Sequence, residues 1–200
     1  MSVITVDDMK ARAAQADFYA NLASHDPPSE YLQIIGSISI RWGRIEAILT
    51  ERLILESRVE DGIGNLLVAP MDGTTKFSRL ISILKFRNDP VWESYSAVFK
   101  ACGGAKSTRN ILAHWCYMGF DEETDHVFFC NNDAPYIRDD GKLAAPIRAY
   151  SLQALRRLDY ASKVILHVIV TGRPPDDLDQ SSVDTLAAED GGDRTATPHP

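Results

Sequence analysis

The chain has 200 residues, of which 44% are hydrophobic and 24% are charged, and its formal net charge is −7. These proportions are ordinary for a globular protein, and the length predicts one domain with a real hydrophobic core. No apolar run approaches the ~18–20 residues of a membrane-spanning helix, and the N-terminus lacks the pattern of a signal peptide. We therefore expect a cytoplasmic protein that does not enter a membrane.

The negative charge is concentrated at the C-terminal end. From Pro174 onward seven acidic residues stand against one arginine, whereas residues 1–173 carry 20 basic and 21 acidic residues. The body of the protein is thus close to neutral, which does not argue for nucleic-acid binding but leaves room for a local basic surface. Because residues 174–200 are polar, acidic and almost without aromatic side chains, we expect them to form a disordered tail.

The N-terminal part of the chain predicts two helices. Residues 1–28 contain a short helix, Asp7 to Leu22, followed by a linker with two prolines. From Ser29 to about Ser57, apolar residues recur at spacings of three and four, which predicts a long amphipathic helix. The Gly- and Pro-containing stretches of 61–64 and 70–73 are typical of turns, so we expect them to punctuate the connection that follows this helix.

The middle of the chain predicts shorter helices. The apolar pattern indicates a helix from Thr74 to Phe86 and another from Val91, with Asp89 as its N-cap and a proline between them. The pair Gly103-Gly104 either weakens this helix or splits it in two. Helical character resumes at Ser107 and continues to His114.

After His114 the hydrophobic pattern changes. Two aromatic segments flank an acidic turn and predict a β-hairpin at about 115–131, with a third short strand near Ile147 to Tyr150. The pattern of 151–171 predicts the last helix, which Gly172 and the following prolines end. The predicted fold is mainly α, an up-and-down bundle of about four main helices with a small hairpin inserted before the last one, and residues 29–173 form this domain.

The stretch Arg109-Asn110-Ile111-Leu112-Ala113-His114 suggests chemistry. An arginine stabilises charge on a phosphate, and a histidine transfers protons around it. Arg194 and His199 repeat the spacing in the tail, so the position of the first pair at the end of a bundle helix matters more than the spacing. Five helical residues rotate by about 140°, so Arg109 and His114 would not stack, and a composite site needs another element or a second subunit.

The Arg-Asn-x-x-x-His run after bundle helices, together with Trp-Gly-Arg-Ile-Glu at 42–46, resembles the HEPN family (higher eukaryotes and prokaryotes nucleotide-binding). The likeness in pattern covers about residues 30–172, and its specific part is the six-residue motif. The resemblance implies a helical bundle, commonly a dimer in which two copies of the motif face each other. Many members of that family are metal-independent ribonucleases of toxin–antitoxin, phage-defence or RNA-processing systems.

The resemblance also implies roles for the catalytic residues Arg109, Asn110 and His114. His114 would act as general acid or base, Arg109 would bind the scissile phosphate, and Asn110 would orient the imidazole or bind the phosphate. It implies no metal and no cofactor, and its implied partners are RNA, a second copy of the chain and an antitoxin protein. The leading candidates for a local basic surface that binds RNA are Arg41, Arg44 and Lys106. Arg52 and Lys100 could add to this surface.

Two alternatives to a ribonuclease remain open. The chain could be a non-catalytic HEPN-like scaffold, or a module for nucleotide binding or oligomerisation, or else a helical subunit of a larger assembly. In that case Arg109 would pair with an acid such as Glu46, and His114 would be an ordinary histidine at a helix end.

The number and spacing of the cysteines predict neither a metal site nor a set of disulfide bonds. Cys102, Cys116 and Cys130 are odd in number and widely spaced, so we expect reduced, mostly buried thiols. His114 with Cys116 and Cys130 lacks the paired spacing of a zinc site.

Overall fold

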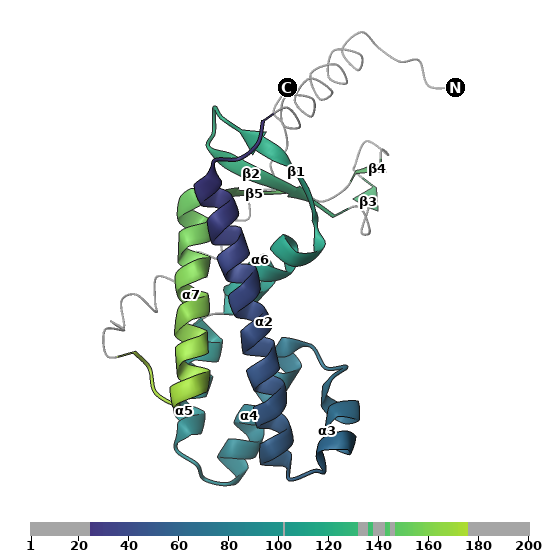
Figure 1. The fold of residues 1–200 in the computed structure, drawn as a ribbon, viewed down its shortest axis with the longest axis vertical. Coiled ribbons are helices and arrows are strands. Elements are labelled where there is room, and N and C mark those ends of the chain that lie inside the picture. The colour runs from purple at the N-terminus through teal and green to yellow at the C-terminus, as the bar shows by residue number, and fades with distance from the viewer. Residues whose placement is uncertain (1–24, 102, 132–135, 138–142, 145–146, 176–200) are drawn as a thin grey trace. The chain divides into compact units, whose positions relative to one another are not determined.

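The computed structural model describes residues 25–101, 103–131, 136–137, 143–144 and 147–175. The expected helix at 7–22 and nearly all of the expected acidic tail lie outside these residues. The described chain is mainly helical, with a small antiparallel sheet before the last helix (Figure 1). Its elements are α2 (Ser29–Ser57), α3 (Asp61–Val68), α4 (Gly73–Phe86), α5 (Val91–Ala101), α6 (Gly103–His114), β1 (Cys116–Asp121), β2 (His126–Cys130), β3 (Tyr136–Ile137), β4 (Leu143–Ala144), β5 (Ile147–Ser151) and α7 (Leu152–Thr171).

The chain divides into two compact units. The β unit takes in the chain up to Gln33 and Asn110–Leu155, and the helical unit takes in Ile34–Arg109 and the described chain from Arg156 onward. Helices α2, α6 and α7 therefore contribute residues to both units.

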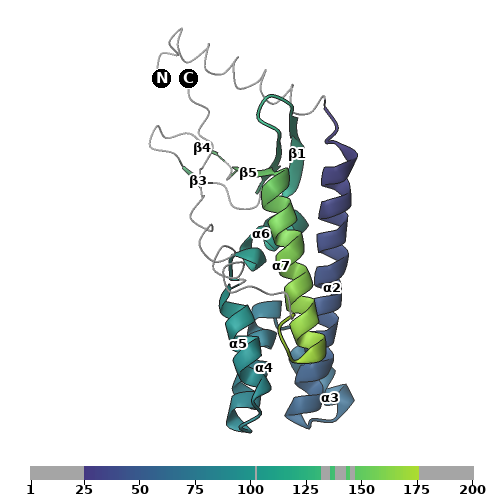
Figure 2. The same ribbon diagram turned by 90° about the vertical axis from the view of Figure 1, so that its left-hand side faces the viewer.

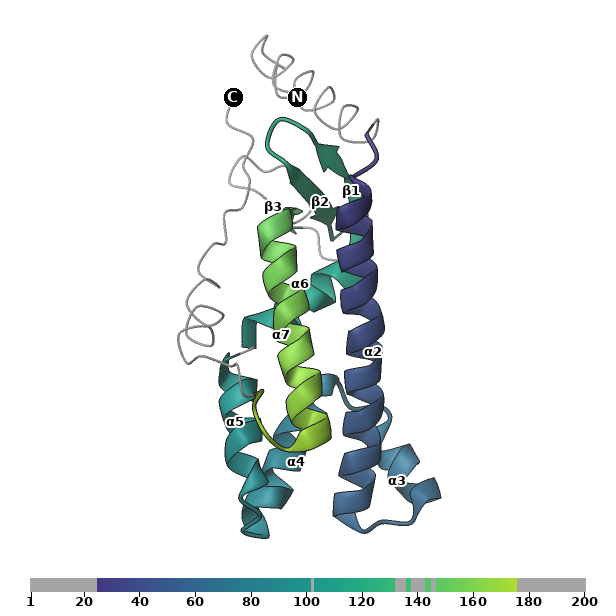
Figure 3. The same ribbon diagram turned by 60° about the vertical axis from the view of Figure 1, so that its left-hand side comes forward.

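The helical unit is built around one apolar core. Within it α2 lies beside α7 and α4 lies beside α5, as two further views show (Figures 2 and 3). Most of the expected apolar positions of α2 are buried and the others are half-buried, which confirms the predicted helical face. His167 of α7 is exposed and not in the core, although its apolar surroundings in the sequence favoured a core or interface position. The core residues are Trp42, Ile45, Leu49, Leu53, Ile54, Val68, Phe77, Leu80, Leu84, Tyr95, Val98, Ala161, Val164, Ile165, Val168 and Ile169.

A polar network ties α2 to α7 inside the helical unit. Nη1 of Arg41 donates to Oδ1 of Asp159 at 2.6 Å and to the Oγ of Ser162, which is fully buried, at 2.7 Å. Nη2 of Arg41 donates to Oγ of Ser37, which in turn donates to Oδ1 of Asp159. Lys163 contacts the other carboxylate oxygen of Asp159 at 2.6 Å. The carboxylate is thus satisfied on both oxygens, as a largely buried charge requires.

Helix α3 was not expected from the sequence, because Gly62 and Gly64 are typical of a turn. In the structure Gly64 is a buried helical residue, and a Cβ at this position would lie 2.7 Å from Cγ2 of Ile54 in α2. The glycine therefore serves the close packing of α3 against α2 and does not make a turn. The interpretation of 61–64 as punctuation of a connection was wrong for this reason.

The caps of the other helices follow the sequence. The carboxylate of Asp72 accepts hydrogen bonds from the backbone N–H groups of Thr74 and Thr75 and starts α4. Asp89 accepts one from the N–H of Val91, so its predicted role as N-cap of α5 is confirmed. Helix α5 ends at Ala101 and α6 begins at Gly103, earlier than expected, on either side of Cys102, which lies outside the described residues.

The β unit contains the predicted hairpin as part of a larger sheet. Strand β1 pairs antiparallel with β2, from Cys116↔Cys130 to Asp121↔His126, and the register shifts between Tyr117 and Gly119. Strand β5 pairs with the other side of β2, which confirms the predicted third strand and gives the order β1-β2-β5. The two-residue strands β3 and β4 form a second pair that the sequence did not predict.

Tyr31 anchors the N-terminal turn of α2 within the β unit. Its hydroxyl donates to the backbone carbonyl of Asp125 at 2.7 Å and accepts from the N–H of Leu152 at 3.0 Å, and its ring packs against Phe120. Burial raises the pKa of this phenol to about 12. The hydroxyl thereby satisfies one of the N–H groups that the first turn of α7 leaves without a helical acceptor.

Candidate functional site

The residues of the motif all lie on α6, but they belong to different units. Arg109 is part of the helical unit, whereas Asn110 and His114 are part of the β unit.

Arg109 is held by two residues of α2. Its Nη2 lies 2.6 Å from Oε1 of Glu46, and its guanidinium lies over the ring of Trp42 at 5.6 Å from the ring centre. The two α2 residues are four apart and share one face of that helix. The ion pair with Glu46 that the non-catalytic alternative required is present. Because the two side chains are 18% and 34% exposed, the pair is in contact with solvent and restrains the guanidinium without burying it.

His114 is the last residue of α6, and its side chain is exposed. The imidazole makes no hydrogen bond or ion pair with another residue in the described part of the chain. Asn110, one helical turn earlier, is half-buried, and Ile111 is buried. This end of α6 therefore buries its apolar side chain Ile111. The imidazole of His114 is accessible to a molecule from solution.

The candidate RNA-binding residues differ in their surroundings. Arg41 is engaged in the network with Asp159, and Arg44, three residues further along α2, is exposed. Lys106 belongs to α6, but its side chain lies outside the described part of the structure.

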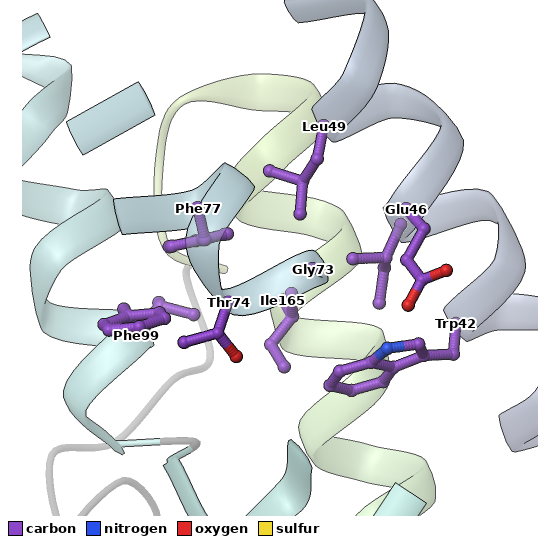
Figure 4. A pocket seen from close by; sticks show the side chains of 10 residues that line it. Trp42, Glu46, Leu49, Gly73, Thr74, Phe77, Phe99 and Ile165 are labelled. Carbon is purple, nitrogen blue, oxygen red and sulfur yellow. The ribbon is translucent and has the colours of Figure 1, made fainter. Parts of the chain in front are cut away.

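An apolar cavity of about 120 Å³ lies within the helical unit beside Glu46 (Figure 4). The indole of Trp42 and the carboxylate of Glu46 lie next to each other at one side, and Phe77, Phe99 and Ile165 form other parts of the wall. A cavity of this kind, lined mainly by hydrocarbon, holds a molecule about the size of benzene more readily than it holds water. The ion pair of Arg109 thus borders an apolar space. Trp42 is also part of the core, whereas the cavity depends on residues of four helices, α2, α4, α5 and α7, which local sequence patterns do not bring together.

Because Gly73, the first residue of α4, lines the cavity, a side chain at this position should change the stability of the protein. A Cβ there would lie 3.4 Å from Oε1 and 3.5 Å from Cγ of Glu46, which is ordinary van der Waals contact. We expect Gly73→Ala to raise the free energy of unfolding by about 0.4–1 kcal/mol, because alanine restricts the unfolded chain and the methyl group narrows the cavity. Urea denaturation measures this change.

Gly43→Ala is the matched control for this substitution. A Cβ at Gly43, inside α2, has no neighbour within 4 Å, so the gain there comes from the helix backbone alone, at about 0.5–1 kcal/mol. A loss of stability in Gly73→Ala beside a gain in Gly43→Ala would show that Glu46 cannot accommodate the methyl group.

The described residues contain no cluster of three or more His, Cys, Asp or Glu side chains arranged to hold a metal ion. None of the described helices is both long and apolar enough to cross a membrane. In comparisons with known proteins, no family model, no curated protein and no solved structure matches the chain.

Proposed function

We propose that the chain is a metal-independent endoribonuclease of the HEPN type. The observation that carries the proposal is His114, an exposed imidazole at the end of α6, five residues after an arginine whose guanidinium is fixed in orientation. An accessible imidazole and a restrained guanidinium on one element are the two groups that phosphodiester transfer to a neighbouring hydroxyl requires.

In this reaction the ribose 2′-oxygen attacks the adjacent phosphorus, and the bond from phosphorus to the leaving 5′-oxygen breaks. His114 removes the proton of the 2′-hydroxyl or protonates the leaving oxygen, and Arg109 stabilises the charge on the phosphate. Asn110 orients the imidazole or binds a phosphate oxygen. The products are a 2′,3′-cyclic phosphate and a 5′-hydroxyl, and the step needs no metal ion.

The proposal extends to the biological setting. A metal-independent ribonuclease of this type acts on cytoplasmic RNA as a toxin or phage-defence component, and an antitoxin protein holds it inactive. The site consists of two motifs in a homodimer, because the step of about 140° between Arg109 and His114 directs them to different sides of α6.

The experiment is RNA cleavage by the purified full chain in the presence of EDTA. We expect cleavage of single-stranded RNA with cyclic phosphate ends, and growth arrest when the chain is expressed alone. If the wild-type chain leaves a panel of cellular RNAs intact and does not slow growth, the nuclease proposal is wrong.

A non-catalytic scaffold is the second candidate, and the ion pair between Arg109 and Glu46 favours it. Together with the contact to Trp42, this pair accounts for the arginine as a link between α6 and α2. The scaffold predicts binding or oligomerisation without cleavage, so the same assay, combined with the mass of the chain in solution, separates the two candidates.

A further inference from the structure

Two cysteines that are fourteen positions apart in the sequence face each other in the sheet of the β unit. Cys116 is the first residue of β1, Cys130 is the last residue of β2, and the two are direct partners in the antiparallel register. They are thiols and are not joined by a disulfide in this structure. The sequence suggested only widely spaced, mostly buried thiols. Cys116 is in fact exposed, while Cys130 is buried.

The register sets the distance between the two residues. Directly opposed residues of antiparallel strands have Cα atoms about 4.5–5.5 Å apart, and their side chains point to the same face of the sheet. Disulfides span Cα distances of about 4.4–6.8 Å. The backbone of the hairpin therefore already holds the two cysteines at bonding range.

We propose that Cys116 and Cys130 form a thiol–disulfide modification site that reacts with a low-molecular-weight disulfide such as oxidised glutathione and closes a reversible cross-strand disulfide. The inference does not depend on the proposed nuclease activity, because it concerns only residues of the hairpin.

The difference in exposure gives the order of the two steps. The thiolate of Cys116, which solvent reaches, attacks one sulfur of oxidised glutathione, forms a mixed disulfide and releases one glutathione thiolate. Cys130 then loses its proton and attacks the Cys116 sulfur, which releases the second glutathione. Burial raises the pKa of the Cys130 thiol, in keeping with its role as the second, resolving thiol. The two protein thiols lose two electrons and two protons, and one oxidised glutathione becomes two reduced molecules.

The geometry also predicts that the bond is easily reduced. Opposed residues in a sheet have Cβ atoms about 4.5–5.5 Å apart, whereas a relaxed disulfide needs about 3.5–4.5 Å. The strands must approach each other locally when the bond closes, and strained disulfides have higher reduction potentials. A pair of this kind responds to the redox state of its surroundings instead of serving as a permanent structural link.

The test uses the full chain with Cys102→Ser, which leaves the proposed pair as the remaining cysteines. The protein is equilibrated in buffers of reduced and oxidised glutathione, alkylated and digested, and its peptides are identified by mass spectrometry. We expect a linked peptide that contains Cys116 and Cys130, with the loss of two hydrogen atoms from the intact mass, and full reversal by dithiothreitol. In the Cys116→Ser variant, which changes an exposed side chain, Cys130 should resist glutathionylation.

The Cys130→Ser variant separates the second step from the first. It should accumulate the mixed disulfide at Cys116, because the resolving thiol is gone. The proposal is overturned if the chain with both cysteines accumulates the same stable glutathione adduct, if its thiols remain reduced throughout the series, or if the disulfides that form join two chains. Circular dichroism spectra of each variant confirm that the helices are intact, so the redox result does not depend on a folding defect.

Discussion

Arg41→Met is expected to lower the free energy of unfolding by about 2–4 kcal/mol, because it removes a cation and hydrogen-bond donor from a largely buried carboxylate that then keeps its contact with Lys163. The side chains of Arg41 and Asp159 are only 16% and 14% exposed, so water cannot replace the lost contacts easily. The substitution also removes donors to Ser162 and Ser37. Methionine keeps most of the aliphatic volume, so the loss reports on charge and hydrogen bonds more than on packing.

The cost of this substitution should depend on pH. Burial alone would raise the pKa of Asp159, but hydrogen bonds from Lys163, Arg41 and Ser37 outweigh that effect and hold the pKa below its ordinary value. The network therefore contributes its full stability above the pKa of an unfolded aspartate, about 3.9, and loses it as the pH falls through the lower folded-state pKa. We expect the difference between wild type and Arg41→Met to be largest near neutral pH and to shrink below about pH 4.

Arg44→Met is the matched control, since Arg44 lies on the same helix and is exposed. It should change the free energy of unfolding by no more than about 0.5 kcal/mol, as surface substitutions usually do. Urea denaturation of the three proteins at pH 7 and pH 3 measures all of these effects. Equal losses in both variants, or a loss in Arg41→Met that persists unchanged at pH 3, would exclude the network as a source of stability.

The elements that the sequence predicted well are those with a single dominant period. Helices α2, α4 and α7 each carry an apolar face over many residues, and their predicted limits differ from the structure by at most one residue. Helix α3 was missed because Gly64 is needed for tertiary packing and not for a turn. A side chain at this position would collide with Ile54 of α2, ten residues earlier. Local turn preferences cannot reveal such a requirement, since it arises only when the two helices pack.

In the candidate site, too, features carried by neighbouring residues in the sequence could be predicted, whereas features that depend on packing between distant segments could not. The motif on α6 was visible because its residues are adjacent in sequence, and the pairing of Arg109 with Glu46 was one of the stated alternatives. The partners of Arg41 were not foreseen, because the helix face that it shares with α7 depends on how two helices pack. The opposition of Cys116 and Cys130 was not foreseen either. It depends on strand register, which an irregularity near Tyr117 shifts by one residue.

His114→Ala should reduce the rate of RNA cleavage by about 10²–10⁴-fold, the usual contribution of a general acid or base. The fold should be unaffected, because His114 is exposed and its imidazole makes no hydrogen bond or ion pair with the described residues. Single-turnover cleavage of a labelled RNA in EDTA measures the rate, and urea denaturation measures the stability. A large loss of cleavage without a loss of stability is the result that a purely structural histidine would not give.

Two variants control for this result. His167→Ala removes another exposed histidine, on α7, and should leave both cleavage and stability unchanged. Arg109→Lys keeps a positive charge beside Glu46 but loses the planar fork of donors, so it should lower cleavage while largely preserving the ion pair. If His114→Ala cleaves as fast as wild type, the motif is not part of the mechanism.

A mixture of the two inactive variants Arg109→Ala and His114→Ala tests whether each site is shared between two copies. If a site takes its arginine from one copy and its histidine from the other, a mixed dimer holds one site with both residues intact. Random exchange of subunits should then restore about a quarter of the wild-type activity, since half of the dimers are mixed and half of their sites are complete. If both residues act within one chain, every site in the mixture lacks one of them, and no activity returns. Recovery therefore depends on subunit exchange, and it locates the partner of His114 on the second copy of the chain.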